Sequence, residues 1–393
     1  MKILLLHPHD VFSKEEPWTR RITSLAGEFT KRLHEVRLVY FLKDAGHCQA
    51  PFSRDGVEFV PLPRRGGPSS LVKHGIAISR LARWADVVHF QKCFHYCAIP
   101  AVFGALANDK PVHYDWDDWE EKIYCDMVRP PSAAVRTFLH TLETALPRIA
   151  DTVSVSSQKL RRLCIGLGVE EERIFDVPVG ADPESFNPTV NPDWIKRKFG
   201  LKGRTALYLG QLHGAQYADL FLRSAKIVLE RKGEMLHFMI VGDGAGLGKL
   251  KVLAKDLDIE ERVIFTGAVE HDKVPAYIAS ADIAVAPFED NDVTRCKSPL
   301  KIVEYLAAGR PIVASDVGDV RAMVGDCAIL TEAGSPASLA GGILKLLGDE
   351  RLRTELGARA RKRAEEYYNW GRAAETLLEA YGKAIGPHNQ DGI

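Results

Sequence analysis

The sequence is poor in cysteine, lacks a long apolar run and carries no excess charge of either sign. Seven cysteines are spread over 393 residues without a Cys-x-x-Cys pair, which is typical of a reduced, cytoplasmic protein rather than a disulfide-stabilised secreted one. The longest apolar run, residues 98–107, is about half as long as a membrane-spanning helix. Lysine plus arginine and aspartate plus glutamate both total 52, so no overall basic field favours a nucleic acid partner.

Metal and targeting signals are also weak. Cys93, His95 and Cys97 lie close together, but their spacing matches neither a zinc finger nor a zinc ribbon, and no second cluster follows. We therefore predict no metal site. Residues 1–6 are apolar but are not followed by a small-residue cleavage site. They are predicted to form a first strand rather than a signal peptide.

The sequence does contain a regular alternation of short β-branched runs with longer stretches of helical period. This alternation predicts parallel sheets covered by helices on both faces. A turn-rich segment, residues 183–202, interrupts it. We therefore expect an α/β protein with two doubly wound, Rossmann-like domains, residues 1–184 and 185–369, facing across a cleft. Strands are predicted at residues 3–6, 36–41, 57–60, 87–90, 112–114, 152–155, 174–177, 206–209, 237–241, 263–265, 283–286, 312–314 and 328–330.

The most informative segment, residues 296–315, is predicted to form a loop, a capped helix and a buried strand. Ser298 is a good N-cap, Pro299 suits the first helical position and Gly309 ends the helix. A helix start attracts anions, and it disfavours a cation such as Lys301 by about 0.3–1 kcal/mol unless an anion is bound there. Together with Glu304, which could hold hydroxyls, this pattern predicts a phosphate-plus-polyol ligand such as a nucleotide sugar. The alternative is a capped helix with a surface Lys–Glu pair.

Two glycine loops follow predicted strands of the second domain. Gly242, Asp243 and Gly244 end a strand and open a helix, which suits phosphate binding, but the spacing fails the dinucleotide pattern and excludes a nicotinamide site. The loop from Gly210 onward can bring its backbone close to a phosphate. In both cases the alternative is a plain turn.

The first domain offers an unusual acidic and aromatic segment, residues 113–121. Asp115, Trp116 and Asp117 follow a strand, and carboxylates and indole rings are groups that hold sugars. The alternatives are a solvated acidic loop or a metal site. Residues 10–21 follow the first strand and carry Trp18 and Arg20, so they are predicted at the same edge of the sheet. Basic and apolar residues mix in 71–84, which predicts either a domain-surface helix or a peripheral membrane contact.

Several motifs resemble one known family. They are 241–244, 263–269, 277–282 and 304–311 in the second half, with 150–156 and 177–182 in the first. On these residues the chain resembles a glycosyltransferase of the GT-B fold, family 4 type, over nearly its whole length. The resemblance implies that a C-terminal helix, about 370–385, packs back on the first domain.

The same resemblance implies roles for individual residues. Glu304 would hold the donor ribose, and residues 298–301 would meet phosphate and sugar. Cys296 stands where the family has a first glutamate, and Asp117 stands where it has a histidine. Gln211 and Gln216 replace two diphosphate-binding cations, and Arg295, Lys297 and Lys301 could compensate from the other side. The predicted donor-binding set is Gly210, Gln211, Gln216, Gly242, Asp243, Gly244, Val269, Arg295, Cys296, Ser298, Pro299 and Leu300.

We therefore expect a retaining glycosyltransferase that needs neither metal nor cofactor and uses a nucleotide sugar as substrate. Asp117, Lys301 and Glu304 are the predicted catalytic residues. Trp18, Arg20, Asp115 and Trp116 are predicted on the side of the acceptor, which would be a saccharide, a lipid-linked molecule or a small molecule. The expected location is the cytoplasm, with the inner membrane face as an option. The alternatives are a non-catalytic nucleotide-sugar or glycan-binding protein and a nucleotide-sugar epimerase of the same fold.

Overall fold

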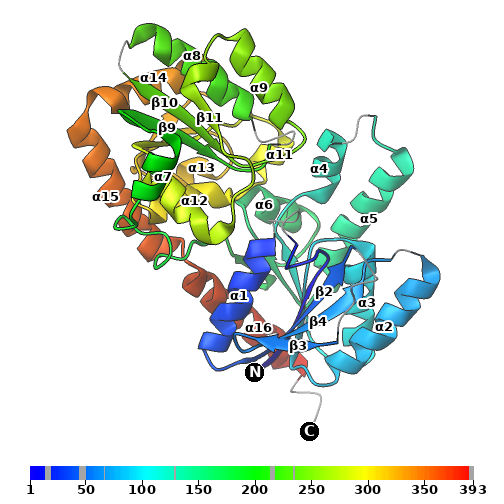
Figure 1. The fold of residues 1–393 in the computed structure, drawn as a ribbon. Helices are drawn as coiled ribbons and strands as arrows, with labels where there is room; N and C mark the ends of the chain where they lie inside the picture. The colour runs from blue at the N-terminus through cyan, green and yellow to red at the C-terminus, as the bar shows by residue number, and fades with distance from the viewer. Residues whose placement is uncertain are drawn as a thin grey trace. The chain divides into compact units, whose positions relative to one another are not determined.

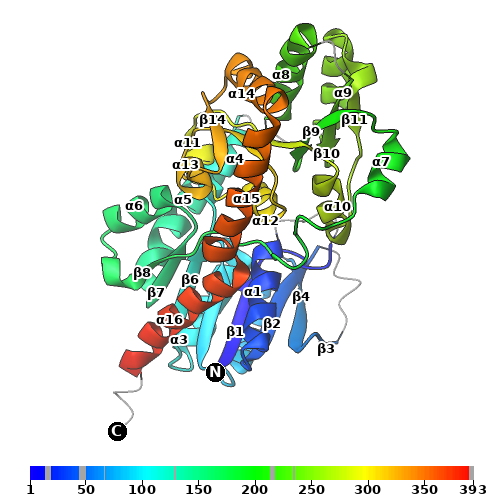
Figure 2. The ribbon, with the colours of Figure 1, turned by 90° about the vertical axis from the view of Figure 1, so that its left-hand side faces the viewer.

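The computed structural model describes residues 1–13, 19–43, 50–65, 67–127, 130–212, 217–232 and 235–388. The chain divides into two compact units, which Figures 1 and 2 show from two sides. Unit 1 consists of residues 1–178 and 370–393, and unit 2 of residues 179–369. The first unit thus ends at Pro178 rather than after Glu184. Each unit is a doubly wound α/β fold, which confirms the predicted fold class.

Unit 1 contains an eight-stranded sheet in the order β3-β4-β2-β1-β5-β6-β7-β8. Its strands run parallel apart from β3, which is antiparallel to β4. The strands are β1 Lys2–His7, β2 Glu35–Leu42, β3 Phe52–Arg54, β4 Val57–Pro63, β5 Val87–Gln91, β6 Val112–Trp116, β7 Thr152–Val155 and β8 Ile174–Asp176. The helices are α1 Arg20–Lys31, α2 Pro68–Ala82, α3 His95–Leu106, α4 Glu120–Met127, α5 Ala133–Ile149, α6 Gln158–Gly166 and α16 Trp370–His388.

The C-terminal helix α16 is part of unit 1. Tyr381 is fully buried, and its hydroxyl lies 2.7 Å from Nδ1 of His89 on β5. The Tyr381 ring also packs against Phe29 of α1, with ring centroids 5.7 Å apart. The last helix of the chain therefore packs on the sheet that contains the first strand.

Unit 2 contains a six-stranded sheet in the order β11-β10-β9-β12-β13-β14, and its paired strands are parallel. The strands are β9 Arg204–Leu209, β10 Leu236–Val241, β11 Val263–Phe265, β12 Ile283–Ala286, β13 Ile312–Ser315 and β14 Ala328–Thr331. The helices are α7 Asp193–Phe199, α8 Ala218–Arg231, α9 Leu247–Asp256, α10 Val274–Ala279, α11 Asp292–Arg295, α12 Leu300–Ala307, α13 Val320–Val324, α14 Pro336–Gly348 and α15 Glu350–Tyr367.

All thirteen predicted strands occur within three residues of their predicted bounds, because most are short runs of β-branched and other apolar residues that are largely buried. The additional strand β3 was not predicted. It pairs with β4 through a two-residue turn at Asp55 and Gly56, whose φ angles are 52° and 79°. Asp-Gly is a strong hairpin signal, and the two positive φ angles show that it acts as one here.

The start of α12 corrects one local prediction. The N-cap is Pro299, and the helix begins at Leu300, one residue later than predicted. The Ser298 hydroxyl caps no helical N–H; its Oγ accepts a hydrogen bond from the backbone N–H of Val179 at 3.2 Å instead. The other end agrees with the prediction, since Gly309 lies just past the helix at a φ of 62°.

Candidate functional site

The topology places one candidate site at the centre of each sheet. In unit 2 the chain runs outward from β9 through β10 to β11, and then from β12 through β13 to β14 on the other side. The order therefore reverses between β9 and β12. In unit 1 it reverses in the same way between β1 and β5. Ligands of open α/β sheets bind beyond the carboxyl ends of the strands at such reversals.

Lys301 lies at the reversal point of unit 2. It is the second residue of α12 and is only 8% exposed. Its Nζ lies 4.1 Å from the ring centroid of Tyr208 on β9 and 5.6 Å from that of Phe288, just after β12. No residue in the described part of the chain accepts a hydrogen bond from this ammonium group. Burial lowers the pKa of Lys301 to about 7.

Glycines keep the space beside Lys301 open. A Cβ on Gly210 would come within 2.9 Å of the Lys301 Nζ, and the φ of Gly210 is 150°. A Cβ on Gly242, at a φ of 144°, would collide with the carbonyl oxygen of Gly210. The neighbouring strands β9 and β10 are thus each followed by a glycine. Because these glycines have no side chain, the two loops can pack closely together beside the buried Lys301 ammonium group. Gly244 also has a positive φ, 154°, and its N–H donates to Oδ1 of Asp243 at 2.7 Å.

Glu304 lies one turn after Lys301 on α12 and is 3% exposed. Its Oε1 is 3.9 Å from Nδ1 of His271, which begins a short 3-10 helix, His271–Lys273. Val269, two residues earlier, is half-buried and packs against the apolar core of the unit. Burying the Glu304 carboxylate costs free energy unless polar groups donate hydrogen bonds to it. The sequence reasoning missed His271, whose only signal is its place shortly after the end of β11.

The other predicted donor-binding residues differ in their surroundings. Arg295 is half exposed and binds Asp290 through two hydrogen bonds of 2.6 and 2.8 Å. Cys296 and Pro299 are buried, Leu300 and Gln211 are half-buried, and Asp243 is exposed. Gln216 lies outside the described residues. Lys301 therefore lies directly beside the Gly210 turn, whereas Arg295 is already paired with an acid.

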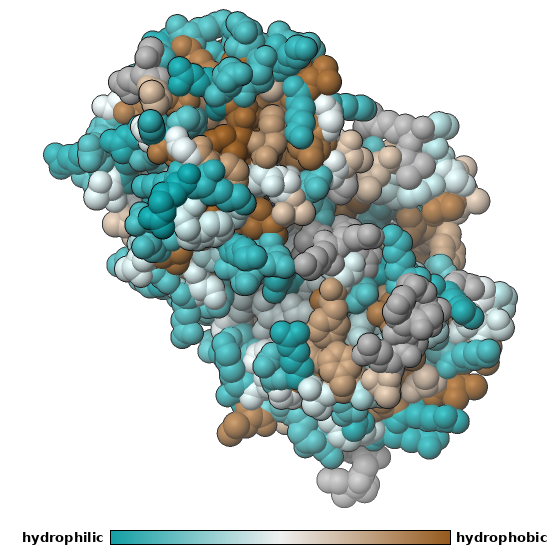
Figure 3. Space-filling view, viewed as in Figure 1, coloured by the Kyte–Doolittle hydropathy of each residue, from teal (hydrophilic) through white to brown (hydrophobic). Residues whose placement is uncertain are grey.

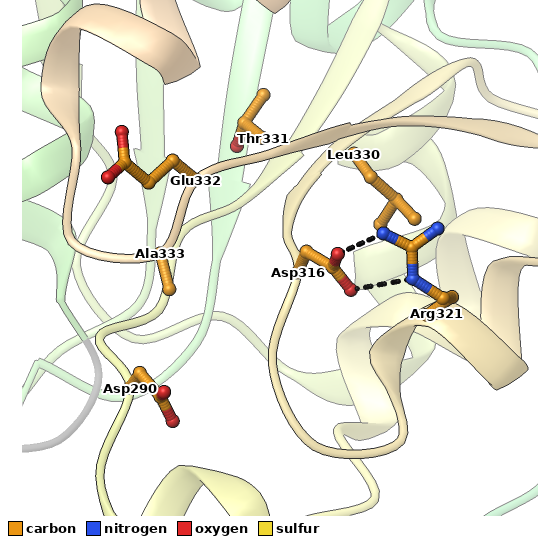
Figure 4. Close-up of a pocket in the computed structure, with 7 residues that line it drawn as sticks. All are labelled: Asp290, Asp316, Arg321, Leu330, Thr331, Glu332 and Ala333. Atoms are coloured by element: carbon orange, nitrogen blue, oxygen red, sulfur yellow. Dashed lines mark hydrogen bonds and ion pairs between the residues drawn. The ribbon is translucent and has the colours of Figure 1, made fainter.

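A hollow of about 460 Å³ lies beyond the ends of β13 and β14 (Figure 4). Its polar walls include Asp290, Asp316 and Glu332. Arg321 is bound there by Asp316, with Nε and Oδ1 3.1 Å apart. None of the predicted site residues lines this hollow, although Asp290 connects it to Arg295.

In unit 1, Asp117 follows β6 next to the reversal point. Gln91 at the end of β5 donates a hydrogen bond to its Oδ2 at 3.0 Å, and Lys92 Nζ lies 3.2 Å from its Oδ1. Burial and the neighbouring acids raise the pKa of Asp117 to about 7, against the opposing effect of Lys92. A carboxyl group with a pKa near neutrality can exchange a proton with a substrate hydroxyl.

Asp115 and Trp116 lie in the interior of unit 1. Asp115 has no exposed surface and binds Arg21 of α1 through bonds of 2.7 and 2.8 Å. Burial raises the pKa of Asp115, but the Arg21 ion pair and hydrogen bonds outweigh it and hold the pKa below its usual range. Trp116 is 2% exposed and donates its indole N–H to Glu143 at 3.3 Å. Both side chains are therefore buried and are not exposed to a ligand. Arg20 lies on the surface at the start of α1, and Trp18 is outside the described residues.

Lys92 was missed by the sequence reasoning. It is 4% exposed, has a φ of 67°, and its Nζ lies 3.2 Å from Asp118 and 2.6 Å from Glu120 in addition to Asp117. A residue other than glycine with positive φ is strained and is concentrated at functional sites. Asp117, Asp118 and Glu120 are close enough together to hold a metal ion. The Lys92 ammonium lies among these same three carboxylates.

Two doubly wound units, one with a buried cation beside glycine turns, define a GT-B type α/β protein. Both halves of the chain match family models of glycosyltransferases. Residues 203–349 match the model described as "Glycosyl transferases group 1", and residues 19–180 match the "Glycosyl transferase 4-like domain". Together the two matches cover most of the chain, which confirms the resemblance seen in the sequence.

Curated relatives of the chain are also named as glycosyltransferases. The chain is 26% identical over 264 residues to a D-inositol 3-phosphate glycosyltransferase of Kineococcus radiotolerans, covering 62% of this chain and 59% of that protein. It is 29% identical over 243 residues to the protein of the same name from Nocardia farcinica, covering 59% and 52%. The aligned part thus spans little more than half the length of these relatives.

Solved structures agree with the fold. Anabaena Alr3699/HepE in complex with UDP and glucose matches with a TM-score of 0.75 and 16% identity, over 97% of this chain and 99% of that one. A glycosyltransferase from Rickettsia africae matches with a TM-score of 0.76 and 12% identity, over 98% and 99%. These likenesses concern the fold.

Proposed function

We propose that the protein transfers a sugar from a nucleotide-sugar donor to an acceptor hydroxyl, with retention of the anomeric configuration and without a metal ion. One observation carries the proposal: the buried Lys301 ammonium has no hydrogen-bond acceptor among the described residues and lies beside two glycine turns. A buried cation without a partner is costly, and a bound phosphate would satisfy it. The UDP bound by the Anabaena protein of the same fold adds support for a nucleoside diphosphate ligand.

The donor-side roles follow from position in unit 2. Lys301 would bind the diphosphate, which carries the negative charge of the leaving group. The backbone at Gly210 and Gly242 would let that diphosphate approach closely. Glu304 would accept hydrogen bonds from the ribose hydroxyls. Ser298, Pro299 and Leu300 would place the start of α12 near the phosphate.

In unit 1 Asp117 would receive the acceptor. Its raised pKa suits a group that holds the acceptor hydroxyl and takes up its proton as the new C–O bond forms. The nucleoside diphosphate leaves with the electron pair of the broken bond between sugar and phosphate. Its phosphate oxygen is a second acceptor for that proton. Asp115 would act as a positioning residue, since the Gln91 amide donates to both Asp115 and Asp117, at 3.1 and 3.0 Å. Trp116 would act in the same way through its indole hydrogen bond to Glu143.

The acceptor we propose is a saccharide, a lipid-linked molecule or a small molecule. A lipid-linked acceptor would require contact with a membrane at its inner, cytoplasmic face. Within the described part of the chain, no helix is both long and apolar enough to cross a bilayer, so such a contact would be peripheral. Six described cysteines are free thiols, in keeping with a reducing location.

The proposal is tested by calorimetry with UDP, GDP, ADP and CMP, followed by product analysis with the matching sugar nucleotide. Binding of one nucleoside diphosphate and formation of a glycoside would support it. Binding without turnover would favour a non-catalytic nucleotide-sugar-binding protein. One observation favours that second function: Arg295, a cation expected to compensate for the two glutamines, is engaged by Asp290. An isomerised donor would identify an epimerase.

A further inference from the structure

Helices α2 and α3 of unit 1 pack unusually closely because glycines lie at their contact. A Cβ on Gly104 of α3 would come within 2.9 Å of Ile78 Cγ2 and 3.0 Å of the Ser79 backbone nitrogen. A Cβ on Gly75 of α2 would come within 3.2 Å of the Phe103 ring. The Phe103 ring therefore lies directly over the backbone of α2. The outer surfaces of the two helices thus form one continuous face.

This face is apolar to a degree that is unusual for a surface. Val72 lies three positions before Gly75 and Ile76 lies one position after it. Phe103 packs against the same glycine. One helical turn to either side of Phe103, α3 exposes Ile99 and Leu106. We call these five residues the apolar stripe, and their exposed fractions are 62% for Val72, 48% for Ile76, 39% for Ile99, 56% for Phe103 and 67% for Leu106. Large apolar side chains exposed together mark an interaction surface.

Basic residues border the apolar stripe. Lys73, Arg80 and Arg83 are exposed along the outer side of α2 and just past its end. Arg83 donates through Nε to Asn108 at 3.3 Å, so it lies beside the end of α3. Neither α2 nor α3 contains an aspartate or a glutamate. Figure 3 shows brown hydrophobic and teal hydrophilic residues together on the surface over α2.

We propose that the apolar stripe and its basic border bind the surface of a membrane that contains anionic lipids. Apolar side chains would enter the boundary between headgroups and acyl chains, while lysine and arginine would remain among the lipid phosphates. The charges distinguish this partner from a second copy of the chain. In a two-fold symmetric dimer the same patch meets itself, so the basic residues of α2 would face one another and repel.

The purpose of this membrane contact rests on the proposed function, because a lipid-linked acceptor requires such a contact. The physical claim is separate from transfer. The face belongs entirely to unit 1, and Lys301 and Glu304 belong to unit 2. Membrane binding and nucleotide binding can therefore be lost independently.

The test measures co-flotation of the full chain with vesicles of phosphatidylcholine alone and of phosphatidylcholine mixed with phosphatidylglycerol. Wild-type protein is expected to float with the mixed vesicles, and less so as salt is raised. Two double variants address the two components: Ile76→Ser with Leu106→Ser removes apolar contact, and Lys73→Glu with Arg80→Glu reverses the charge. Each is expected to weaken vesicle binding about tenfold or more.

Helix α9 of unit 2 supplies matched controls. Val252 there is 59% exposed, and Lys251 and Lys255 are exposed one turn apart. Val252→Ser and the double reversal Lys251→Glu with Lys255→Glu should bind vesicles as the wild type does. Thermal unfolding and calorimetry with UDP, measured on every variant, separate a lost surface from a lost fold.

Three results would overturn the proposal. One is wild-type protein that ignores anionic vesicles. Another is a pair of α2–α3 variants that bind vesicles no worse than the α9 controls do. The third is a wild-type dimer in sedimentation that the variant Ile76→Ser with Leu106→Ser dissociates, since a second copy would then be the occupant. If vesicle binding follows the expected pattern while no nucleotide binds, the proposed transfer fails and the membrane surface remains.

Discussion

The Lys301 ammonium lies 4.1 Å from the ring centroid of Tyr208, on a strand more than ninety residues earlier in the chain. An aromatic face attracts a cation but does not replace the hydrogen bonds that the cation loses on burial. Since no described residue accepts a hydrogen bond from this ammonium group, we expect its burial to cost free energy that a bound phosphate would offset.

Replacing Lys301 should separate phosphate recognition from base recognition. Lys301→Met should weaken UDP binding roughly 10- to 100-fold, because a charge-assisted hydrogen bond contributes about 1.5–3 kcal/mol. Binding of uridine should change little. Calorimetry with both ligands provides the comparison, and equal losses for the two would contradict a phosphate contact.

The same lysine should make stability depend on pH. In the folded protein the pKa of Lys301 is about 7, whereas the unfolded chain keeps this group protonated up to a pKa of about 10.5. Between these values unfolding takes up a proton, so the free energy of unfolding should rise with pH across that window. Denaturant titrations between pH 7 and 10 test this against Lys301→Met, which should lack this contribution.

UDP binding should also move protons. A phosphate beside Lys301 favours the charged ammonium, so binding above pH 7 should take up a proton from solution. The observed binding enthalpy should then vary with the ionisation enthalpy of the buffer. Enthalpies that are identical in phosphate and Tris buffers at pH 8 would count against this coupling.

Asp117→Asn should reduce the rate of transfer by roughly 10²–10⁴-fold, the usual effect of removing a group that accepts a proton in the reaction. UDP affinity should stay within twofold of the wild type, because Asp117 lies in unit 1. Asp118→Asn is the matched control, since Asp118 shares the Lys92 contact but is more exposed. A rate loss of the same size in both variants would point to the ion cluster as a whole.

Adding one methyl group at the glycine turns should show how tightly they are built. Gly242→Ala should destabilise the protein by several kcal/mol, since its Cβ would collide with the Gly210 carbonyl oxygen. Gly248→Ala is the control, because nothing lies within 4 Å of its Cβ position. The free energies of unfolding from urea titrations should differ accordingly, and equal values would show that the Gly242 loop moves freely.

The sequence predicted most of the fold because most of its strands are short apolar runs, each bounded by turn-forming or helical segments, so that each can be recognised by itself. Lys301 and Glu304 could likewise be found from one local motif. Gln91, Lys92 and His271 could not, because their significance comes from side chains distant in the chain: Lys92 joins β5 to acids that follow β6. The start of α12 was misplaced for the same reason, since the Ser298 hydroxyl binds a backbone group some 120 residues away.

Lys92 has a consequence for how this edge of unit 1 works. A cation that belongs to the polypeptide is supplied at one per molecule and cannot be chelated, diluted or exchanged for another ion. Its position is set by the backbone directly after β5, so the acids around it are expected to keep one arrangement whatever the ionic composition of the surroundings. An amine also differs from a divalent ion in holding only one positive charge against three carboxylates, which leaves this end of the sheet net negative and ready to attract protons or hydroxyl hydrogens.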